Sequence, residues 1–225
     1  MRCLDRPVWA SLTSHHARFA EGDDLARRFV RDVNVFGAPC DDSPSALASL
    51  AGLVSPGESV LLLQTARVAI PTGLVPLREV QGVQMLAPRG TAFESPGSGI
   101  APLGDCDAPE MLALAKLTEP GPFLPRTHVM GAFLGIRIDG RLAAMAGERM
   151  RFPGYTEVSG VCTHPDFRGQ GFARRLSAAV ASRIQARGDQ AFLHAWASNH
   201  AAISLYESLG FELRAQVNVA ELGRI

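Results

Sequence analysis

The sequence has few cysteines and no excess of either charge, and each shortage excludes a class of protein. The four cysteines, Cys3, Cys40, Cys106 and Cys162, are far apart and form no CxxC pair. This spacing argues against a metal or disulfide framework and favours reduced thiols in the cytoplasm. Lys and Arg together number 22, as do Asp and Glu, so the formal net charge is zero. A broad nucleic-acid-binding surface is therefore not expected.

Long apolar segments are also missing. No run approaches the roughly 20 apolar residues that a membrane helix needs. The N-terminal segment MRCLDRPVWASLTSHH lacks the continuous apolar core of a signal peptide. We therefore expect neither a membrane nor nucleic acid as a partner. The 225 residues suffice for one domain or two small ones, and the hydrophobic fraction of 47% is ordinary for a globular protein.

Signals of secondary structure are sparse in the N-terminal half. Residues 43–54 are predicted to form a helix, because Ser43 can cap it and the apolar residues recur at helical spacing. Strands are expected at Ser59–Gln64, which is continuously apolar in its centre, and at Glu79–Leu86, which alternates.

The segment Ala87–Asp105 is rich in Pro, Gly and Ser and is predicted to be a long loop or a linker. We therefore divide the chain into an N-terminal α+β lobe, residues 1–105, which could lie on the acceptor side of a site, and a C-terminal domain, residues 106–225.

The C-terminal half shows clearer order. A helix is predicted from Asp107 to Leu117, and the Asp139-Gly140 pair predicts a type I′ hairpin turn between strands at Ala132–Ile138 and Arg141–Arg151. Further elements follow: a strand over 156–163, a helix from Phe172 to Arg187, a strand at Gln190–Trp196, a helix over 200–209 and a strand over 211–222. The order strand, helix, strand predicts a parallel crossover unit.

A glycine-rich stretch, HPDFRGQGFARRL at residues 164–176, precedes the helix of this crossover. A helix start presents unpaired N–H groups and the positive end of the helix dipole. Gly169 and Gly171 lack a Cβ, so an anion could approach the backbone closely, and the neighbouring arginines add positive charge. A tight turn without a ligand is the alternative, but ligands usually bind at crossovers between parallel strands.

Two nucleotide-binding motifs do not fit this stretch. A Walker loop needs Gly-Lys-Ser/Thr, which is absent from the sequence. A dinucleotide fingerprint needs a third glycine where Arg174 stands, and Asp189 precedes its strand instead of ending it. A nucleotide-binding α/β domain is therefore disfavoured.

Two motifs resemble those of the GNAT superfamily of acetyl-CoA-dependent N-acyltransferases. The family pattern Arg/Gln-x-x-Gly-x-Gly/Ala is matched by Arg168-Gly169-Gln170-Gly171-Phe172-Ala173. A second pattern, Asn followed by Ala-x-x-Leu-Tyr-x-x-x-Gly-Phe, is matched by Asn199, Ala202, Leu205, Tyr206, Gly210 and Phe211. The resemblance spans roughly Thr127 to Leu222 and is nearest to the branch related to glycine N-acyltransferase.

The resemblance implies a mixed, mostly antiparallel sheet with a splayed pair of parallel strands, flanked by helices. It implies that the glycine loop binds the pyrophosphate of acetyl-CoA, and that the pantetheine arm pairs with the strand Val161–Thr163, where Gly160 fits a bulge. No metal is expected. The residues expected to bind acetyl-CoA are Val161, Cys162, Thr163, Arg168, Gly169, Gln170, Gly171, Phe172, Ala173, Arg174, Asn199 and Tyr206.

The catalytic roles that the resemblance implies fall on Tyr206 and Glu157. Tyr206 matches the usual general acid of the family, since a tyrosine is protonated at neutral pH and can donate to a thiolate. Glu157 stands where several family members hold a base, and burial there would raise its pKa, or the carboxylate could relay protons through water; a solvated glutamate is the alternative. His194 is the second candidate for the base, although a lone strand histidine is more often structural. Cys162 lacks the His/Asn arrangement of a covalent mechanism.

The sequence thus predicts a cytoplasmic N-acetyltransferase that transfers the acetyl group of acetyl-CoA directly to an amine acceptor, which could be a small molecule, an amino acid or a peptide. A non-catalytic acyl-CoA-binding module is the alternative. No motif specifies the acceptor, and the N-terminal half and the segment Phe123–Met130 are expected to shape its pocket. A homodimer is one assembly state that we consider.

Overall fold

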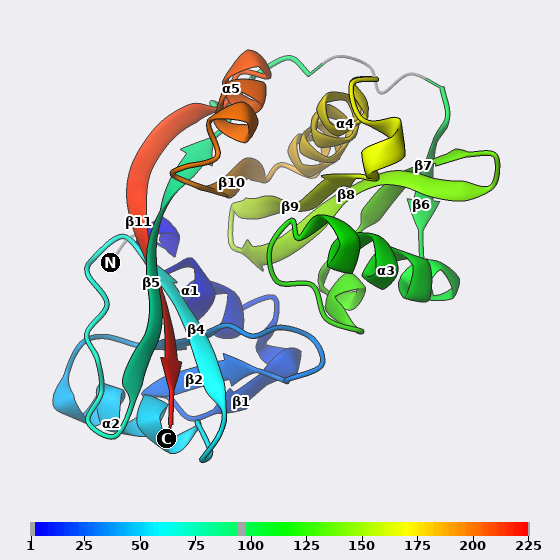
Figure 1. Cartoon of the computed structure of the whole chain (residues 1–225). Coiled ribbons are helices and arrows are strands. Elements are labelled where there is room, and N and C mark those ends of the chain that lie inside the picture. Colours follow the sequence, from blue (N-terminus) through cyan, green and yellow to red (C-terminus); the bar gives the residue numbers. More distant parts are fainter. Residues whose placement is uncertain (1–2, 94–97, 225) are drawn as a thin grey trace.

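The computed structural model describes residues 3–93 and 98–224. One large sheet dominates it (Figure 1), with the strand order β4-β11-β5-β10-β9-β8-β7-β6. Its strands are β4 (Ser59–Gln64), β5 (Val75–Leu86), β6 (Ile100–Leu103), β7 (Phe133–Ile138), β8 (Arg141–Phe152), β9 (Tyr155–Thr163), β10 (Gln190–Trp196) and β11 (Glu212–Gly223). A small sheet contains β1 (Ala20–Gly22), β2 (Ala26–Phe29) and β3 (Gly37–Pro39).

Five α-helices occur in the described part of the chain: α1 (Pro7–Leu12), α2 (Pro44–Gly52), α3 (Ala108–Thr118), α4 (Phe172–Ala186) and α5 (His200–Ser208). None of the helices in these ranges is long and apolar enough to cross a membrane. Helices α3 and α4 cover opposite faces of the half of the sheet formed by β6 to β9 (Figure 1). The alternation of side chains along β8 supplies both contacts, because Ala144 and Ala146 pack in the cluster of α4 whereas Met145 packs in the cluster of α3.

The predicted hairpin and crossover are confirmed. Asp139 and Gly140 have φ angles of 49° and 80°, the left-handed pair that a type I′ turn requires. Strand β9, helix α4 and strand β10 form the crossover, and among the ladders that the described residues form in the large sheet only the β9–β10 ladder is parallel. The fold is therefore the mixed, mostly antiparallel sheet that the resemblance implies.

The parallel pair splays apart after a short contact. Its ladder consists of Gln190↔Tyr155, Ala191↔Thr156 and Phe192↔Glu157, and the two strands continue beyond it without pairing. On its other side β9 has one extra residue opposite β8, since Ser159 pairs with Gly147 but Cys162 pairs with Met145. Gly160 lies at this bulge with φ of 63°, as predicted.

The prediction of a loop over Ala87–Asp105 is wrong in one part. Residues 100–103 form strand β6, which pairs with β7 at the edge of the sheet. Pro102 argued against a strand here, because proline cannot donate a ladder hydrogen bond. An edge strand tolerates a proline, since one of its sides needs no ladder hydrogen bond. Residues 94–97 of the predicted loop lie outside the described residues.

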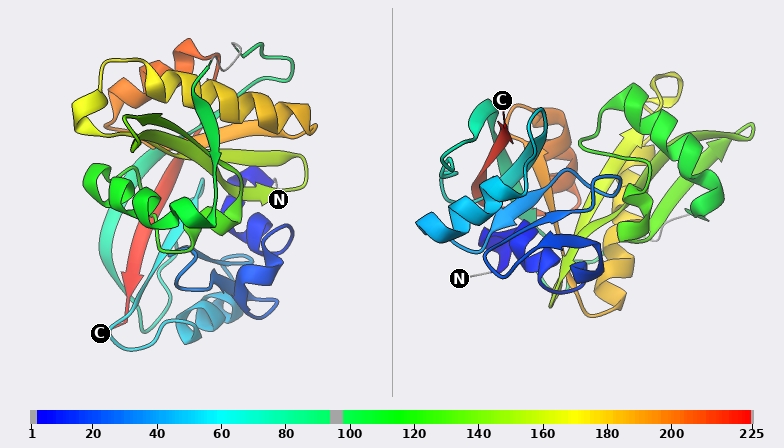
Figure 2. Two further views of the ribbon diagram at one scale, coloured as in Figure 1. Left: turned by 90° about the vertical axis from the view of Figure 1, so that its right-hand side faces the viewer. Right: turned by 90° about the horizontal axis from the view of Figure 1, so that it is seen from below.

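Residues before 105 contribute three strands to the large sheet, namely β6 at one end and β4 and β5 in the other half. β5 lies between β10 and β11, and β4 is paired with β11 at the end of the sheet. Figure 2 shows the remaining N-terminal elements gathered around this end, on the opposite side of the molecule from β6 to β9. The sheet is thus continuous across residue 105, and the division into two units at that residue stays a prediction.

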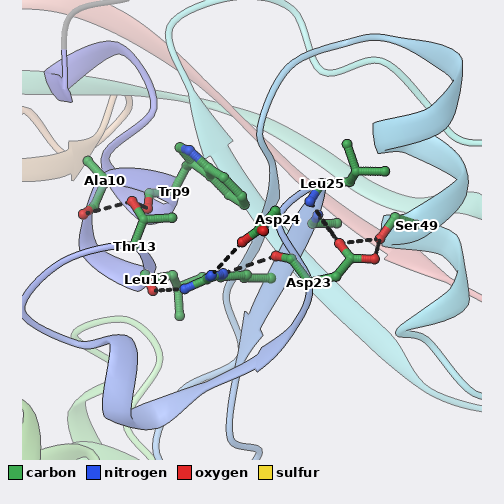
Figure 3. Close-up of polar contacts among 10 residues, drawn as sticks. Trp9, Ala10, Leu12, Thr13, Asp23, Asp24, Leu25 and Ser49 are labelled. Carbon is green, nitrogen blue, oxygen red and sulfur yellow. Dashed lines mark hydrogen bonds and ion pairs between the residues drawn. The ribbon is translucent and has the colours of Figure 1, made fainter.

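Local polar contacts hold the N-terminal elements together (Figure 3). The Asp23 carboxylate accepts hydrogen bonds from the N–H groups of Leu25 and Ala26, both at 2.8 Å, and from the Ser49 hydroxyl at 2.9 Å. These hydrogen bonds hold the pKa of Asp23 below its ordinary value. The chain before β2 is therefore fastened to α2 by one ionised carboxylate.

Candidate active site

A groove of about 440 Å³ runs from the start of α4 to α5. It contains all the residues expected to bind acetyl-CoA except Gln170, although the role of each remains a prediction. The lining comes from the end of β9, the glycine loop with the first turn of α4, helix α5 and the C-terminal end of α3: Val161, Cys162, Thr163, Phe167, Arg168, Gly169, Gly171, Phe172, Ala173, Arg174, Asn199, Ala202, Leu205, Tyr206, Thr118, Glu119 and Pro120.

The glycine loop is built to expose its backbone. Gly169 and Gly171 have φ angles of 80° and 73°, and a Cβ added at either position would meet no atom within 4 Å. Gly171 is also the N-cap residue of α4, so the N–H groups of the first helical turn lack partners within the helix. Arg168 is exposed beside them. The loop therefore offers backbone donors, a helix dipole and a cation to an anion in the groove.

Tyr206 lies where the groove meets a second, smaller cavity. The residue is 8% exposed, and burial raises the pKa of its hydroxyl to about 12. Its ring packs against Phe211 with the centroids 6.1 Å apart. Tyr206 is therefore protonated at neutral pH and can donate a hydrogen bond to a group in either cavity.

The smaller cavity, of about 140 Å³, lies between the splayed ends of β9 and β10. We call it the central cavity. The polar and charged residues in its lining are Glu119, Arg149, His194, Trp196, Asn199 and Tyr206.

Glu157 lies beneath this cavity and does not line it. The residue is fully buried, and both carboxylate oxygens are occupied, because Arg149 donates from Nε to Oε2 at 2.8 Å and from Nη2 to Oε1 at 2.7 Å. The N–H of Met150 also donates to Oε2, at 3.2 Å. Although burial opposes it, the arginine lowers the pKa of Glu157 to about 2. This environment argues against the predicted role of Glu157 as the base.

His194 is also held by the protein through both ring nitrogens. Its Nδ1 is 2.7 Å from Glu157 Oε1, and its Nε2 is 3.0 Å from Nε2 of Gln84. The Gln84 amide nitrogen is a donor, so His194 Nε2 accepts and Nδ1 carries the proton. Neither nitrogen is left to take a proton from a substrate, which argues against His194 as the base.

A third cavity, of about 550 Å³, lies over the sheet formed by β4, β11 and β5, and we call it the outer cavity. It adjoins the central cavity through shared residues that include Leu61, Trp196 and Val219. The N-terminal half supplies Val35, Ser59, Leu61, Arg78 and Val80 to its lining, and the loop after α3 supplies Gly121, Pro122, Phe123 and Leu124.

Two charged residues that line these cavities, Arg149 and Glu119, were not predicted as site residues from the sequence. Arg149 is fixed by its pairing with Glu157, which depends on the register of the β8–β9 hairpin. Glu119 follows α3 and precedes Pro120-Gly121-Pro122, a helix stop that carries no chemical signature. The only sequence signal for Glu119 is an acidic residue at a position where a glycine usually ends a helix.

The comparisons with known proteins agree with this geometry. Residues 133–219 match the family model of FR47-like proteins. A GNAT-family protein from Novosphingobium aromaticivorans, assigned as an acetyltransferase, is 43% identical with a TM-score of 0.93, and the alignment covers 100% of both chains. The chain belongs to the GNAT family. Among curated proteins the search found no match.

More distant GNAT structures share the fold. A GCN5-related N-acetyltransferase from Kribbella flavida is 20% identical with a TM-score of 0.66, over 100% of this chain and 96% of the other. A GCN5-related N-acetyltransferase-like protein from Streptococcus suis is 15% identical with a TM-score of 0.60, over 96% and 92%. GNAT membership supports acyl transfer as the class of reaction. The relation to glycine N-acyltransferase stays a prediction.

Proposed function

We propose that this GNAT protein is an acetyl-CoA-dependent N-acetyltransferase that transfers the acetyl group directly to the amine of a small molecule. The observation that carries the proposal is the continuity of the three cavities. The groove at the glycine loop, the central cavity and the outer cavity adjoin in that order through shared residues. A donor in the groove and an acceptor in the outer cavity would thus meet at the splay between β9 and β10.

The groove offers contacts for two parts of coenzyme A, the pyrophosphate and the pantetheine arm. The glycine loop would bind the pyrophosphate through the N–H groups at the start of α4. Beyond Glu157 the β10 side of β9 has no strand partner among the residues described here. The pantetheine arm, which is rich in amides, would pair with this free edge at Val161–Thr163.

Direct transfer is favoured over an acyl-cysteine intermediate. Cys162 lines the groove, but burial raises the pKa of its thiol to about 11. At neutral pH it is a thiol, whereas the thiolate is the nucleophilic form. The amine itself is therefore expected to attack the thioester carbonyl.

Tyr206 would assist the departure of the CoA thiolate. With a pKa of about 12, the hydroxyl is a weaker acid than an ordinary thiol, so complete proton transfer to the sulfur is uphill. We therefore assign Tyr206 a hydrogen bond to the sulfur as the C–S bond breaks. In the same site Glu157 would serve to hold Arg149 and His194 in place.

Substitution of Tyr206 by phenylalanine tests this assignment. Tyr206→Phe keeps the ring and its contact with Phe211, so the free energy of unfolding is expected to change by no more than about 1.5 kcal/mol, the upper value for one hydrogen bond. We expect kcat to fall about 10²-fold, at the low end for general-acid assistance, with the affinity for acetyl-CoA unchanged. Tyr155→Phe is the matched control, since Tyr155 packs on Phe152 and contacts none of the cavities. Equal kcat for Tyr206→Phe and wild type would mean that the Tyr206 hydroxyl does not assist the reaction and that the residue serves only in packing.

Ligand-dependent melting tests the function itself. Acetyl-CoA is expected to raise the melting temperature, whereas ATP and NAD at equal concentration are not, because a ligand stabilises the folded state only if it binds that state. Release of free thiol from acetyl-CoA in the presence of amines then separates an enzyme from a non-catalytic acyl-CoA-binding module. Stabilisation without thiol release for any amine would favour the module.

A further inference from the structure

Glu119 is the one residue, among those that the structure describes, that lines all three cavities. It follows the last turn of α3, opposite the helix that carries Tyr206. An acceptor amine that approaches a thioester in the central cavity from the outer cavity would pass the residues that the two cavities share, and Glu119 is one of them. The other titratable or charged residues of the three linings are Arg78, Lys116, Glu221, Arg149, His194, Tyr206, Cys162, Arg168 and Arg174.

The Glu119 carboxylate is also free to accept a proton. Its side chain makes no hydrogen bond or ion pair with any residue in the described part of the chain, and the residue is exposed. Glu157, by contrast, is buried with both oxygens occupied by Arg149. The second carboxylate of the outer cavity, Glu221, accepts a hydrogen bond from Ser59 and lines neither the central cavity nor the groove.

The backbone holds Glu119 in a conformation that a glutamate does not favour. Its φ and ψ angles are 49° and 53°, in the left-handed region, and its N–H donates to the carbonyl of Ala115 at 2.8 Å. Glycine is the usual residue at such a helix end, and the proline that follows restricts the position further. Residues held in sparsely populated backbone conformations cluster at functional sites, which is consistent with a chemical use for this carboxylate.

We infer that Glu119 is the general base that deprotonates the acceptor amine, an inference that rests on the proposed function. The ammonium of the acceptor gives one proton to a Glu119 oxygen, which passes it to solvent. The nitrogen lone pair then forms the C–N bond to the thioester carbonyl carbon. As the C–S bond breaks, the Tyr206 hydroxyl donates a hydrogen bond to the departing sulfur. The second amine proton leaves to solvent, and the thiolate takes one proton from solvent. The products are the N-acetyl amine, the free thiol and one released proton.

Two substitutions at this position separate chemistry from folding. Glu119→Gln keeps the shape of the side chain and removes the proton acceptor. Glu119→Gly also removes it but suits the left-handed backbone, so this variant is expected to be at least as stable as wild type. Glu207→Gln is the matched control, because Glu207 is exposed on α5 beside Tyr206 and contacts none of the three cavities.

At pH 7 we expect both Glu119 variants to lose about 10²–10⁴ in kcat/KM for the amine, while the Kd for acetyl-CoA stays within a few-fold. The deficit should shrink as pH rises, because more of the acceptor is then already the free amine. Formate should restore part of the rate to Glu119→Gly, where the removed side chain leaves room, but not to Glu119→Gln. Glu207→Gln should match wild type.

Two results would overturn the inference: activity of Glu119→Gln within about threefold of wild type when chemistry is rate-limiting, or a deficit of Glu119→Gly that neither rising pH nor formate reduces. Either result would assign Glu119 to the architecture of the cavities. Failure of the wild-type protein to release thiol from acetyl-CoA with any amine would instead contradict the proposed function, so the two failures are distinguishable.

Discussion

Gly171→Glu is expected to abolish measurable binding of acetyl-CoA while the protein stays folded. The glycine has φ of 73° and faces open space, so the new side chain would project into the groove without a clash in the protein core. Its carboxylate would occupy the anion position at the start of α4 and repel the pyrophosphate. The left-handed backbone costs a side chain about 1–2 kcal/mol, which most domains of this size tolerate.

Calorimetric titration with acetyl-CoA measures this effect, and two variants control for it. Gly140→Glu introduces the same residue at φ of 80° with open space around it, but at the tip of the β7–β8 hairpin, so it should bind acetyl-CoA like wild type. Gly171→Asn tolerates the left-handed backbone without a charge and should weaken binding less than Gly171→Glu. An unchanged Kd for Gly171→Glu would move the pyrophosphate away from the glycine loop.

Arg149→Met is expected to lower the free energy of unfolding by about 3–5 kcal/mol at pH 7, because it leaves the buried Glu157 carboxylate without its cation. The guanidinium also lies 5.1 Å from the centroid of the Phe36 ring, a contact that methionine replaces only in part. Urea denaturation of the wild type and the variant measures the difference. A loss below about 1 kcal/mol would mean that water reaches Glu157.

The pH dependence of this loss identifies its cause. In the wild type the folded pKa of Glu157 is lowered from 4.5 to about 2, so the stability gained is complete above 4.5 and is lost as pH falls toward 2. Without Arg149, burial should raise the pKa of Glu157 in the folded state above its unfolded value. Acidification then protonates the buried carboxylate of the variant and raises the variant's free energy of unfolding. The difference in the free energy of unfolding between the wild type and Arg149→Met should therefore become smaller as pH falls from about 7 to about 4.

A second substitution, at Glu157, should restore part of the stability that Arg149→Met loses. Arg149→Met with Glu157→Gln removes both charges, and the amide oxygen can still accept from His194, the donor to Oε1. The double variant is expected to be more stable than Arg149→Met alone, with a coupling energy in the range of about 0.5–3 kcal/mol that neighbouring residues show. Equal stability of the single and double variants would contradict a charge-based account of the pair.

Local signals were sufficient for several elements in both halves of the chain. Residues 59–64 and 190–196 have the strand boundaries that their apolar runs predict, and Asn199 caps α5 by accepting from the N–H of Ala202 at 3.1 Å. Ser43 caps α2 in the same way, through the N–H of Ala46 at 3.3 Å. These features depend on residues close together in the chain, where composition and spacing are informative.

The remaining features depend on contacts between distant segments. Insertion of β5 between β10 and β11 joins residues more than 100 positions apart, and no local pattern encodes that order. The ionised state of Glu157 follows from Arg149, which the hairpin register brings opposite it, whereas burial alone predicted a raised pKa. Glu119 enters the site only because the end of α3 meets the outer cavity, so its sequence neighbours, Pro120 and Gly121, indicated a helix end and nothing more.

Transfer of the acetyl group from acetyl-CoA to nitrogen is the central claim, and mass analysis of the products tests it most directly. The wild-type protein is incubated with acetyl-CoA carrying a deuterated acetyl group and a panel of small amines, with Gly171→Glu as the negative control. The account predicts an amine that gains the deuterated acetyl group on nitrogen, in equal amount to the free thiol released, and no product with Gly171→Glu. Thiol release without an N-acetylated amine, or an equal yield from Gly171→Glu, would contradict it.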